Sequence, residues 1–295
     1  MTLRSSLLFE ISRRLLPKPV TRTVDYSAYQ DWRTQSLSAS WAAFEHVDLR
    51  GKRVLDFGCG DGALALFLAR ERAAASVVGI DLEAAAIERA TAARDSTSIP
   101  PGVVVEFHVG SVNGIPVPDA SIDVLVAFDC LEHVMSPSPI FQEWFRVLRP
   151  GGRCILEWFP YKGPWGPHME SLIPVPWAHI LFGQRAMFRA AERIYDLPQF
   201  VPRHWDLDPG GKKKTNKWRN WSSFKEQGYI NELDLKTFRQ LVRSAGLKIA
   251  RLDTHSFGGS YLRRTIGNSL MKLPIVGEYF VSFTTIELLR PDIPH

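Results

Sequence analysis

Three closely spaced glycines and two acidic residues follow a short apolar run in residues 54–62 of this 295-residue chain, which read Val-Leu-Asp-Phe-Gly-Cys-Gly-Asp-Gly. An Ala- and Leu-rich helical pattern starts directly afterwards, over residues 63–70. This order predicts a strand, a tight glycine turn and a helix. Glycine lets a ligand lie against bare backbone, and the first turn of a helix offers unpaired N–H groups. The segment therefore predicts a ligand-binding turn.

The acids around this turn indicate which ligand it holds. A dinucleotide fold has the pattern G-x-G-x-x-G, whereas here the third glycine comes one position early. Asp56 stands two residues before the first glycine, where a carboxylate repels phosphate and attracts an ammonium group. Asp81 ends a second apolar run 25 residues after Asp56, and a carboxylate there suits a ribose diol. The pattern favours a nucleoside that carries an amino acid.

Four motifs in order along the chain resemble those of class I S-adenosylmethionine-dependent methyltransferases of the small-molecule type. They occupy residues 54–62, 80–82, 121–135 and 146–152. The resemblance is close over residues 45–160 and loose over 230–290. It implies an α/β fold with a Rossmann-like, doubly wound, mostly parallel seven-stranded sheet. It also implies that S-adenosyl-L-methionine is the cofactor and that the protein is an enzyme.

Alternating strand and helix patterns after residue 52 predict the same doubly wound sheet. The expected strands cover residues 53–57, 76–81, 103–108, 122–128, 153–159, 247–254 and 279–289, and the expected helices 61–73, 83–95, 138–148, 176–196 and 234–246. We expect three parts. An N-terminal helical cover takes residues 1–45, the methyltransferase domain takes 46–160 and 230–295, and a helical, aromatic insertion after the fifth strand takes 160–230 and caps the substrate.

The resemblance places the cofactor at the ends of the strands. The residues that it assigns there are Asp56 at the amino group, Gly58 and Gly60 below the methionine and ribose, Asp81 at the ribose hydroxyls, Leu82 beside the adenine, Ser111 and Val112 after the third strand, and Asp129 and Cys130 near the methyl group. Ser111 stands where many relatives carry an acid for the adenine amino group, and its hydroxyl can still accept that hydrogen bond.

Three further residues near the cofactor keep two interpretations each. Asp61 either contacts the ligand or caps the helix that follows it. Tyr26 and Trp32 either cover the methionine end of the cofactor, as this region does in similar methyltransferases, or pack in the core.

Histidines are the candidate catalytic bases, because imidazole changes its charge near neutral pH. His168 follows the fifth strand in the sequence Pro-Trp-Gly-Pro-His, and it either takes a proton from a hydroxyl or bonds backbone in a tight turn. His133 is a weaker candidate that either takes a proton or lines the pocket. The expected substrate pocket contains Trp165, His168, Trp177 and His204. Metal-ligand spacing is absent, so we expect no metal site.

The net charge of +5 lies entirely within residues 160–230, which hold 11 Lys and Arg against 6 Asp and Glu. This excess is either a solvated lysine loop at 212–214 or a surface that attracts an acidic substrate, anionic lipid or RNA. Leucines on one side of the predicted helix 3–16 allow either packing over the core and cleft or contact with a membrane surface.

Peripheral membrane contact through residues 1–17 or 172–182 therefore stays open. No apolar run reaches the length of a membrane span, and no signal-peptide pattern is present. Three cysteines, far apart and odd in number, indicate free thiols in a reducing compartment. These features predict a cytoplasmic protein, with membrane association left open and no indication of its oligomeric state.

Three classes of function fit the motifs. The first is methyl transfer to a small molecule, above all to a hydroxyl of a natural product, or of a quinone-like, sugar or lipid-linked acceptor. The second is a nucleic-acid or protein methyltransferase, which the sequence Asp-Cys-Leu-Glu at 129–132 disfavours because amino-directed nucleic-acid enzymes carry D/N-P-P-Y/F there. We therefore expect no nucleic-acid partner. The third is a non-catalytic module that binds the cofactor.

Overall fold

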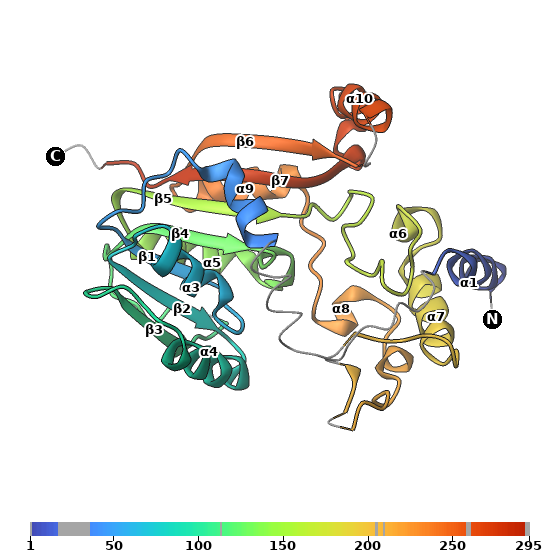
Figure 1. Ribbon diagram of the computed structural model, residues 1–295. Coiled ribbons are helices and arrows are strands. Elements are labelled where there is room, and N and C mark those ends of the chain that lie inside the picture. The colour runs from blue at the N-terminus through green and yellow to red at the C-terminus, as the bar shows by residue number, and fades with distance from the viewer. Residues whose placement is uncertain are drawn as a thin grey trace. The chain divides into compact units, whose positions relative to one another are not determined.

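The computed structural model describes residues 2–16, 36–112, 114–203, 206–208, 210–257 and 261–292. The chain divides into two compact units, which Figure 1 shows as ribbons. The sheet unit comprises Ser27–Trp158, Leu235–Thr254 and Thr284–His295, and the insertion unit comprises Met1–Tyr26, Phe159–Asp234 and His255–Phe283.

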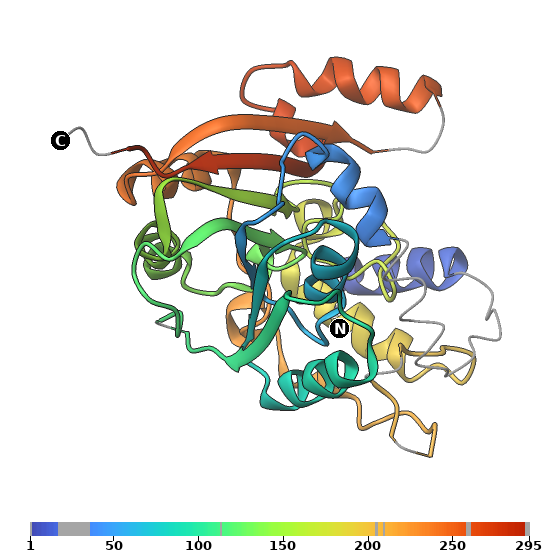
Figure 2. The same cartoon turned by 60° about the vertical axis from the view of Figure 1, so that its left-hand side comes forward.

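Seven strands form one sheet in the order β3-β2-β1-β4-β5-β7-β6. The strands are β1 Arg53–Phe57, β2 Ser76–Asp81, β3 Val104–Val109, β4 Ile122–Phe128, β5 Leu148–Trp158, β6 Lys248–Ser256 and β7 Val281–Leu289. Strands β1 to β5 pair in parallel, and β7 runs antiparallel to β5. Figure 2 shows β7 between β5 and β6. The predicted doubly wound, mostly parallel seven-stranded sheet is confirmed.

Helices cover both faces of this sheet, because the central strands are apolar on both sides. They are α3 Ala63–Glu71 and α4 Ala84–Ser96 on one face, and α5 Pro137–Val147 and α9 Leu235–Ser244 on the other. Val54 and Leu68 share a core with Ile87 on the first face. On the second face, Phe57 packs edge-on against Trp144 with ring centroids 5.5 Å apart.

The prediction of one continuous helix over residues 176–196 is wrong. Two helices occupy this segment, α6 Ala178–Leu181 and α7 Gln184–Tyr195. Gly183 separates them as the N-cap of α7, with φ of +83° and ψ of 156°, an extended conformation that glycine adopts without strain. The helical spacing of the apolar residues gave no indication of this break, because both helices present one face to the same core.

The insertion unit has a core of its own. Phe188 of α7, Trp218 and Phe224 lie buried together in it. Among its described residues, this unit also contains the helices α1 Leu3–Leu15, α8 Phe224–Gln227 and α10 Tyr261–Met271. Helix α10 lies between β6 and β7 in the chain, so residues 255–283 belong to this unit together with the segment after β5. The sequence patterns did not predict α10.

Helix α1 packs against α7, as the packing interpretation of the N-terminal leucines predicts. Leu8 and Phe9 are buried in the shared core, and the guanidinium carbon of Arg193 lies 3.6 Å from the centroid of the Phe9 ring. Leu3, Leu7 and Leu15 of the same helix are exposed. One side of α1 therefore forms core, and another presents leucines to solvent.

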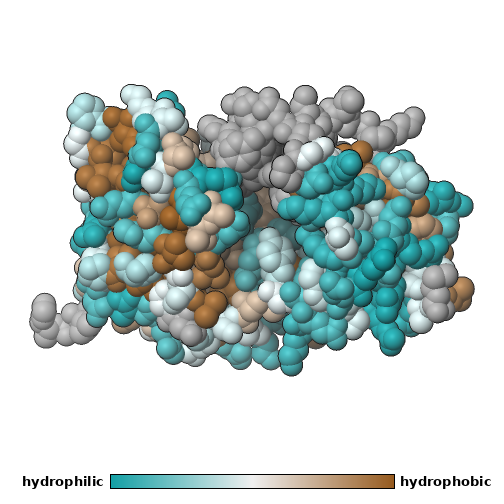
Figure 3. Space-filling model, turned by 90° about the horizontal axis from the view of Figure 1, so that it is seen from below, coloured by the Kyte–Doolittle hydropathy of each residue, from teal (hydrophilic) through white to brown (hydrophobic). Residues whose placement is uncertain are grey.

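Every helix in the described part of the chain is too short or too polar to cross a bilayer. Figure 3 shows one face of the molecule, on which hydrophobic residues form separate patches among hydrophilic ones. Single exposed apolar residues are normal on protein surfaces, whereas contiguous ones call for an explanation.

Candidate functional site

The carboxyl ends of β1, β2, β3 and β4 lie at one edge of the sheet, because these neighbouring strands are parallel. Ligands of open α/β sheets bind beyond this edge. Asp56 of β1 is 1% exposed and lies between Gly79 of β2 and Val126 of β4. A buried carboxylate at a ligand-binding edge is a feature of functional sites, since burial of a charge is costly.

The glycine turn after β1 is anchored on β2. The backbone N–H groups of Gly58 and Cys59 both donate to the carbonyl oxygen of Ile80, each at 2.9 Å. Gly58, Gly60 and Gly62 have φ of +77°, +51° and +82°. All three positions lie in the left-handed region, which favours glycine over residues with a side chain.

The three glycines differ in what surrounds them. A Cβ atom at Gly58 would lie 2.3 Å from Sγ of Cys130, and one at Gly62 would lie 2.7 Å from the ring of Phe107. Apart from Gly60 and its two neighbours in the chain, no atom of the described residues lies within 4 Å of a Cβ placed at Gly60. Gly58 and Gly62 are therefore required for packing, and the backbone at Gly60 borders open space that a ligand can occupy.

Asp81 ties the glycine turn to the helix after β2. Its Oδ2 accepts a hydrogen bond from the N–H of Gly60, and its Oδ1 accepts one from the N–H of Glu83, both at 2.9 Å. Its carbonyl oxygen also accepts from the N–H of Gly110 after β3, at 2.8 Å. The carboxylate thus lies beside the open face of Gly60, where sequence reasoning expects the ribose.

Asp61 does not hold the N-cap position of α3, which belongs to Gly62. The Oδ1 atom of Asp61 instead accepts a hydrogen bond from Nε of Arg89, at 2.8 Å. The capping interpretation of Asp61 is therefore wrong, because the left-handed glycine takes the cap. Contact of this carboxylate with a ligand stays a prediction.

The chain after β2 and β3 presents exposed residues at the same edge. Leu82, Ser111 and Val112 are all exposed. The hydroxyl of Ser111 donates to the carbonyl oxygen of Gly114 at 3.3 Å, and the same carbonyl accepts from the N–H of Ser111. Leu82 and Val112 thus present apolar side chains to solvent at this edge.

After β4 the backbone turns sharply. Asp129 has φ of +51°, uncommon for a residue with a side chain, and its N–H donates to the carbonyl oxygen of Glu157 at 3.3 Å. Burial raises the pKa of the Cys130 thiol well above its ordinary value, and burial does the same for Cys59. Both thiols are therefore in the protonated form at neutral pH.

Sequence reasoning missed Glu157, which is buried near the carboxyl end of β5. Its Oε1 accepts a hydrogen bond from the hydroxyl of Ser40, at 3.1 Å. A clue was present in the sequence, because Glu157 interrupts an apolar strand as Asp56 does in β1.

These residues fit the cofactor that the motifs imply. The buried Asp56 carboxylate suits the ammonium of an amino acid, Asp81 suits a ribose, and the open face of Gly60 lies beside Asp81. The family model of a methyltransferase domain matches residues 55–156, which span this edge of the sheet. The chain contains a class I S-adenosylmethionine-dependent methyltransferase domain. S-adenosylmethionine is the cofactor of this family.

Similar proteins share this methyltransferase domain. An uncharacterized methyltransferase of Mycobacteroides abscessus is 32% identical over 146 residues, which are 50% of this chain and 52% of that protein. A ubiquinone biosynthesis O-methyltransferase of Pseudomonas fluorescens is 35% identical over 115 residues, 38% of this chain and 47% of that protein. The chain spans about half the length of these curated relatives.

A solved S-adenosylmethionine-dependent methyltransferase of Mesorhizobium loti shares the fold. Its TM-score is 0.51 at 20% identity, with 86% of this chain and 100% of that chain covered. The Rossmann-like methyltransferase fold thus extends well beyond the motif region.

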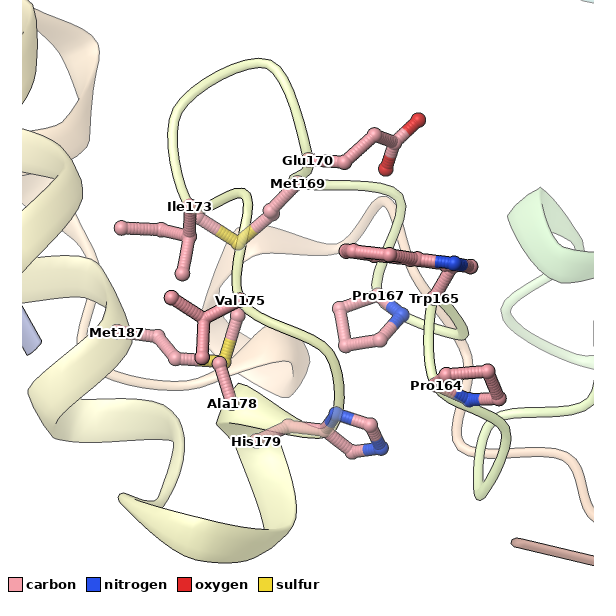
Figure 4. A pocket seen from close by; sticks show the side chains of 10 residues that line it. All are labelled: Pro164, Trp165, Pro167, Met169, Glu170, Ile173, Val175, Ala178, His179 and Met187. Carbon is pink, nitrogen blue, oxygen red and sulfur yellow. The ribbon is translucent and has the colours of Figure 1, made fainter. Parts of the chain in front are cut away.

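The expected pocket residues Trp165, His168 and Trp177 lie in the insertion unit. Trp165 lines a cavity together with His179 of α6. Figure 4 shows the side chains of Met169, Ile173 and Met187 near one another and the carboxylate of Glu170 pointing away from them. The cavity has a volume of about 10 Å³, which is space for about one water molecule. An acceptor the size of a sugar or quinone does not fit in it.

His168 and Trp177 do not line this cavity. His168 has φ of +52°, and its N–H donates to the carbonyl oxygen of Trp165 at 2.9 Å, which is the tight turn of the structural interpretation. Its ring packs edge-on against Phe159, with centroids 4.4 Å apart. The backbone turn at His168 does not test whether its imidazole acts as a base, so that role stays a prediction.

The remaining predicted site residues are His133, Tyr26, Trp32 and His204. In the sheet unit, His133 is half-buried in a 3-10 helix after β4, and its N–H donates to the carbonyl oxygen of Cys130 at 2.9 Å. Tyr26, Trp32 and His204 lie outside the described residues.

His179 makes the stability of the protein depend on pH. Burial of the imidazole lowers its pKa to about 4, against an ordinary value of 6.5. Between these values the unfolded chain binds a proton that the folded chain does not, so stability is complete above pH 6.5 and falls toward pH 4. Between pH 7.5 and pH 5 the expected loss is about 2 kcal/mol. Urea unfolding of the parent and of His179→Gln at pH 7.5 and pH 5 measures it.

The variant is expected to lose less stability between these two pH values than the parent does. Other titrating groups contribute equally to both proteins and cancel in the difference. Equal losses in both proteins would contradict a neutral, buried His179.

Proposed function

We propose that this protein is a methyltransferase that transfers the methyl group of S-adenosylmethionine to a hydroxyl of a small molecule. The observation that carries the proposal is the Asp81 carboxylate bound to the N–H of Gly60 beside an open backbone face. This arrangement provides a ribose acceptor and a ligand-accessible turn at the same edge of the sheet.

Each predicted residue then has a role in binding the cofactor. Asp56 attracts the ammonium group, Asp81 accepts from the ribose hydroxyls, and Gly60 allows close approach of the backbone. Leu82 and Val112 flank the adenine, with Ser111 as an acceptor for its amino group. Asp129 and Cys130 border the methyl group, and Asp61 lies at the start of α3.

S-adenosylmethionine supplies a methyl group that a positive sulfur already activates. The protein contributes position, since alignment of two reactants supplies a large part of the rate enhancement. A hydroxyl acceptor also needs a base, which contributes about 10²-fold to 10⁴-fold. Few residues of the chain therefore need to be reactive, in agreement with the protonated cysteines.

A hydroxyl acceptor is supported by the similarity to the ubiquinone biosynthesis O-methyltransferase of Pseudomonas fluorescens. Natural-product, quinone-like, sugar and lipid-linked hydroxyls all belong to this class. The sequence Asp-Cys-Leu-Glu at 129–132 disfavours a nucleic-acid substrate. A module that only binds the cofactor is the remaining alternative, and the intact acids and glycines of the turn disfavour it.

The purified protein with trideuteromethyl-labelled S-adenosylmethionine tests this proposal. The acceptors are phenols, aliphatic alcohols, amines, a protein mixture and transfer RNA. Mass spectrometry is expected to show labelled methyl ethers from hydroxyl acceptors. Labelled product from amines, protein or RNA alone would contradict hydroxyl transfer. Cofactor binding by calorimetry without product from any acceptor would indicate the non-catalytic module.

His168→Asn tests the proposed base. Asparagine tolerates the positive φ of this position, so the turn is expected to remain folded. We expect kcat to fall by about 100-fold or more and the dependence of kcat on pH to lose its basic-group limb. His133→Asn is the matched comparison, with a smaller effect. An unchanged pH profile in His168→Asn would show that this imidazole is not the base.

A further inference from the structure

Five consecutive residues after α10, Lys272 to Val276, are exposed. Four of them are apolar, namely Leu273, Pro274, Ile275 and Val276. Ile275 is 95% exposed. We call residues 272–276 the apolar loop. Runs of exposed apolar residues are avoided in soluble folds unless they have a function.

Ile275 is held outward by an unfavourable backbone conformation. Its φ is +70°, a value that β-branched residues very rarely adopt. The N–H of Val276 donates to the carbonyl oxygen of Pro274 at 2.8 Å and closes a three-residue turn around Ile275. Strained residues of this kind cluster at binding sites. Holding Ile275 in this backbone conformation therefore costs free energy, and its result is an apolar side chain exposed to solvent.

The backbone of the apolar loop is largely hydrogen-bonded within its own segment. The N–H of Leu273 donates to the carbonyl oxygen of Leu270 at 3.1 Å, and the N–H of Gly277 donates to the carbonyl oxygen of Leu273 at 3.0 Å. Proline at 274 has no N–H to satisfy. Donors that are satisfied internally make it less costly for a loop to leave water. The loop is thus suited to an apolar environment.

A second exposed apolar group lies on a neighbouring element. Ile180 and Leu181 of α6 are exposed. Trp177, directly before α6, donates from Nε1 to the carbonyl oxygen of Tyr279 at 2.6 Å and packs against the ring of Phe280. Tyr279 and Phe280 belong to the 3-10 helix Gly277–Phe280 that follows the apolar loop. Trp177 therefore connects the two exposed apolar groups.

The charge of the chain is concentrated in the same unit. The insertion unit holds 19 Lys and Arg against 11 Asp and Glu, a net charge of +8. The sheet unit holds 17 against 20, a net charge of −3. The exposed leucines of α1 likewise lie beside the exposed Arg4 and Arg14. Cations beside exposed apolar side chains are the pattern of peripheral binding to anionic lipid.

We propose that the insertion unit docks on the surface of an anionic lipid bilayer, with the apolar loop entering the interfacial region. Lys272 pairs with lipid phosphate while Leu273, Ile275 and Val276 leave water. Leu181 and the leucines of α1 provide further contact, within the segments 1–17 and 172–182 whose sequence left membrane contact open. Nucleic acid would account for the charge of the unit but not for four consecutive exposed apolar residues, and an apolar protein pocket would account for those residues but not for the charge.

This proposal does not depend on the methyl acceptor, and flotation of the 295-residue chain with vesicles tests it. The vesicles are phosphatidylcholine alone or an equal mixture with phosphatidylglycerol, at low and high salt. We expect binding to the mixture that weakens with salt, and little binding to phosphatidylcholine alone. Ile275→Asp is expected to weaken the partition coefficient by about tenfold or more, as the loss of one buried aliphatic side chain implies.

Two variants separate the side chain from the fold. Ile275→Gly relieves the positive φ, so its melting temperature is expected to equal or exceed that of the parent while vesicle binding falls. Val104→Asp places the same change at an exposed position of β3 in the sheet unit, and its binding is expected to match the parent.

Three results would overturn the proposal. The first is equal partitioning of the parent and Ile275→Asp. The second is self-association of the parent without lipid, measured by light scattering and abolished in Ile275→Asp, which would identify a second copy as the partner. The third is binding to single-stranded RNA with no binding to the anionic vesicles.

Discussion

Asp81→Ala is expected to weaken the binding of S-adenosylmethionine by about 100-fold or more. The carboxylate holds the N–H groups of Gly60 and Glu83, both at 2.9 Å, and the proposed ribose contact uses the same oxygens. Hydrogen bonds to a charged acceptor contribute about 1.5–3 kcal/mol each. Loss of about 2.7 kcal/mol of binding free energy corresponds to 100-fold. Isothermal titration calorimetry of the parent and the variant measures this difference.

Asp95→Ala is the matched control, because Asp95 is an exposed acid on α4 that pairs with Arg94 at 2.7 Å. Its affinity for the cofactor is expected to equal that of the parent. Asp81→Asn is expected to be intermediate, since one amide oxygen can still accept while the NH₂ group faces a backbone donor. Parent-like affinity of Asp81→Ala would remove the ribose assignment and with it the central support for the proposed site.

Gly58→Ala is expected to lower the free energy of unfolding by about 3 kcal/mol. The added Cβ atom would lie 2.3 Å from Sγ of Cys130, and overpacking of this kind costs about 1–3 kcal/mol. The φ of +77° adds about 1 kcal/mol for any residue with a side chain. Urea unfolding gives the difference between the parent and the variant.

The double variant Gly58→Ala/Cys130→Ala is expected to regain part of this loss, because removal of Sγ relieves the overlap while the positive φ remains. A loss in the double variant equal to that in Gly58→Ala would assign the whole effect to the backbone.

Gly60→Ala provides the contrasting case at the same turn. Beyond its two chain neighbours, no described residue has an atom within 4 Å of its Cβ position, so only the positive φ is expected to affect stability, by about 1 kcal/mol. The methyl group would instead occupy the space proposed for the cofactor. We therefore expect a larger effect on cofactor affinity than on stability, and the reverse order for Gly58→Ala. Unchanged affinity in Gly60→Ala would show that the cofactor does not approach this face.

The sequence predicted the sheet more accurately than the insertion. Strands β1, β2 and β4 have the bounds that the apolar runs indicate, at 53–57, 76–81 and 122–128. The middle residues of these strands are buried on both faces, so the strands are mostly apolar and are followed closely by glycine or acid. Helix α10 and the break at Gly183 escaped prediction, because a surface helix and a helix break leave weak traces in the pattern of apolar residues.

In the candidate site, too, the sequence indicated some residues and missed others. Asp56 and Asp81 were identified from their positions at the ends of apolar runs. Glu157 was not, because its burial and its bond to Ser40 depend on residues 117 positions apart. Aspartate is a common N-cap residue, so the sequence suggested Asp61 as the cap of α3, but Gly62 occupies the N-cap position.

The sequence by itself determined that a glycine turn follows a strand that ends in an acid, and with it the class of fold and cofactor. Such features depend on neighbours within a few residues, which set backbone conformation and the alternation of elements. Only the tertiary structure decided that Gly58 faces a cysteine while Gly60 borders open space, and that Ile275 lies in solvent rather than in a core. Burial and close approach depend on segments far apart in the chain, which a linear pattern does not specify.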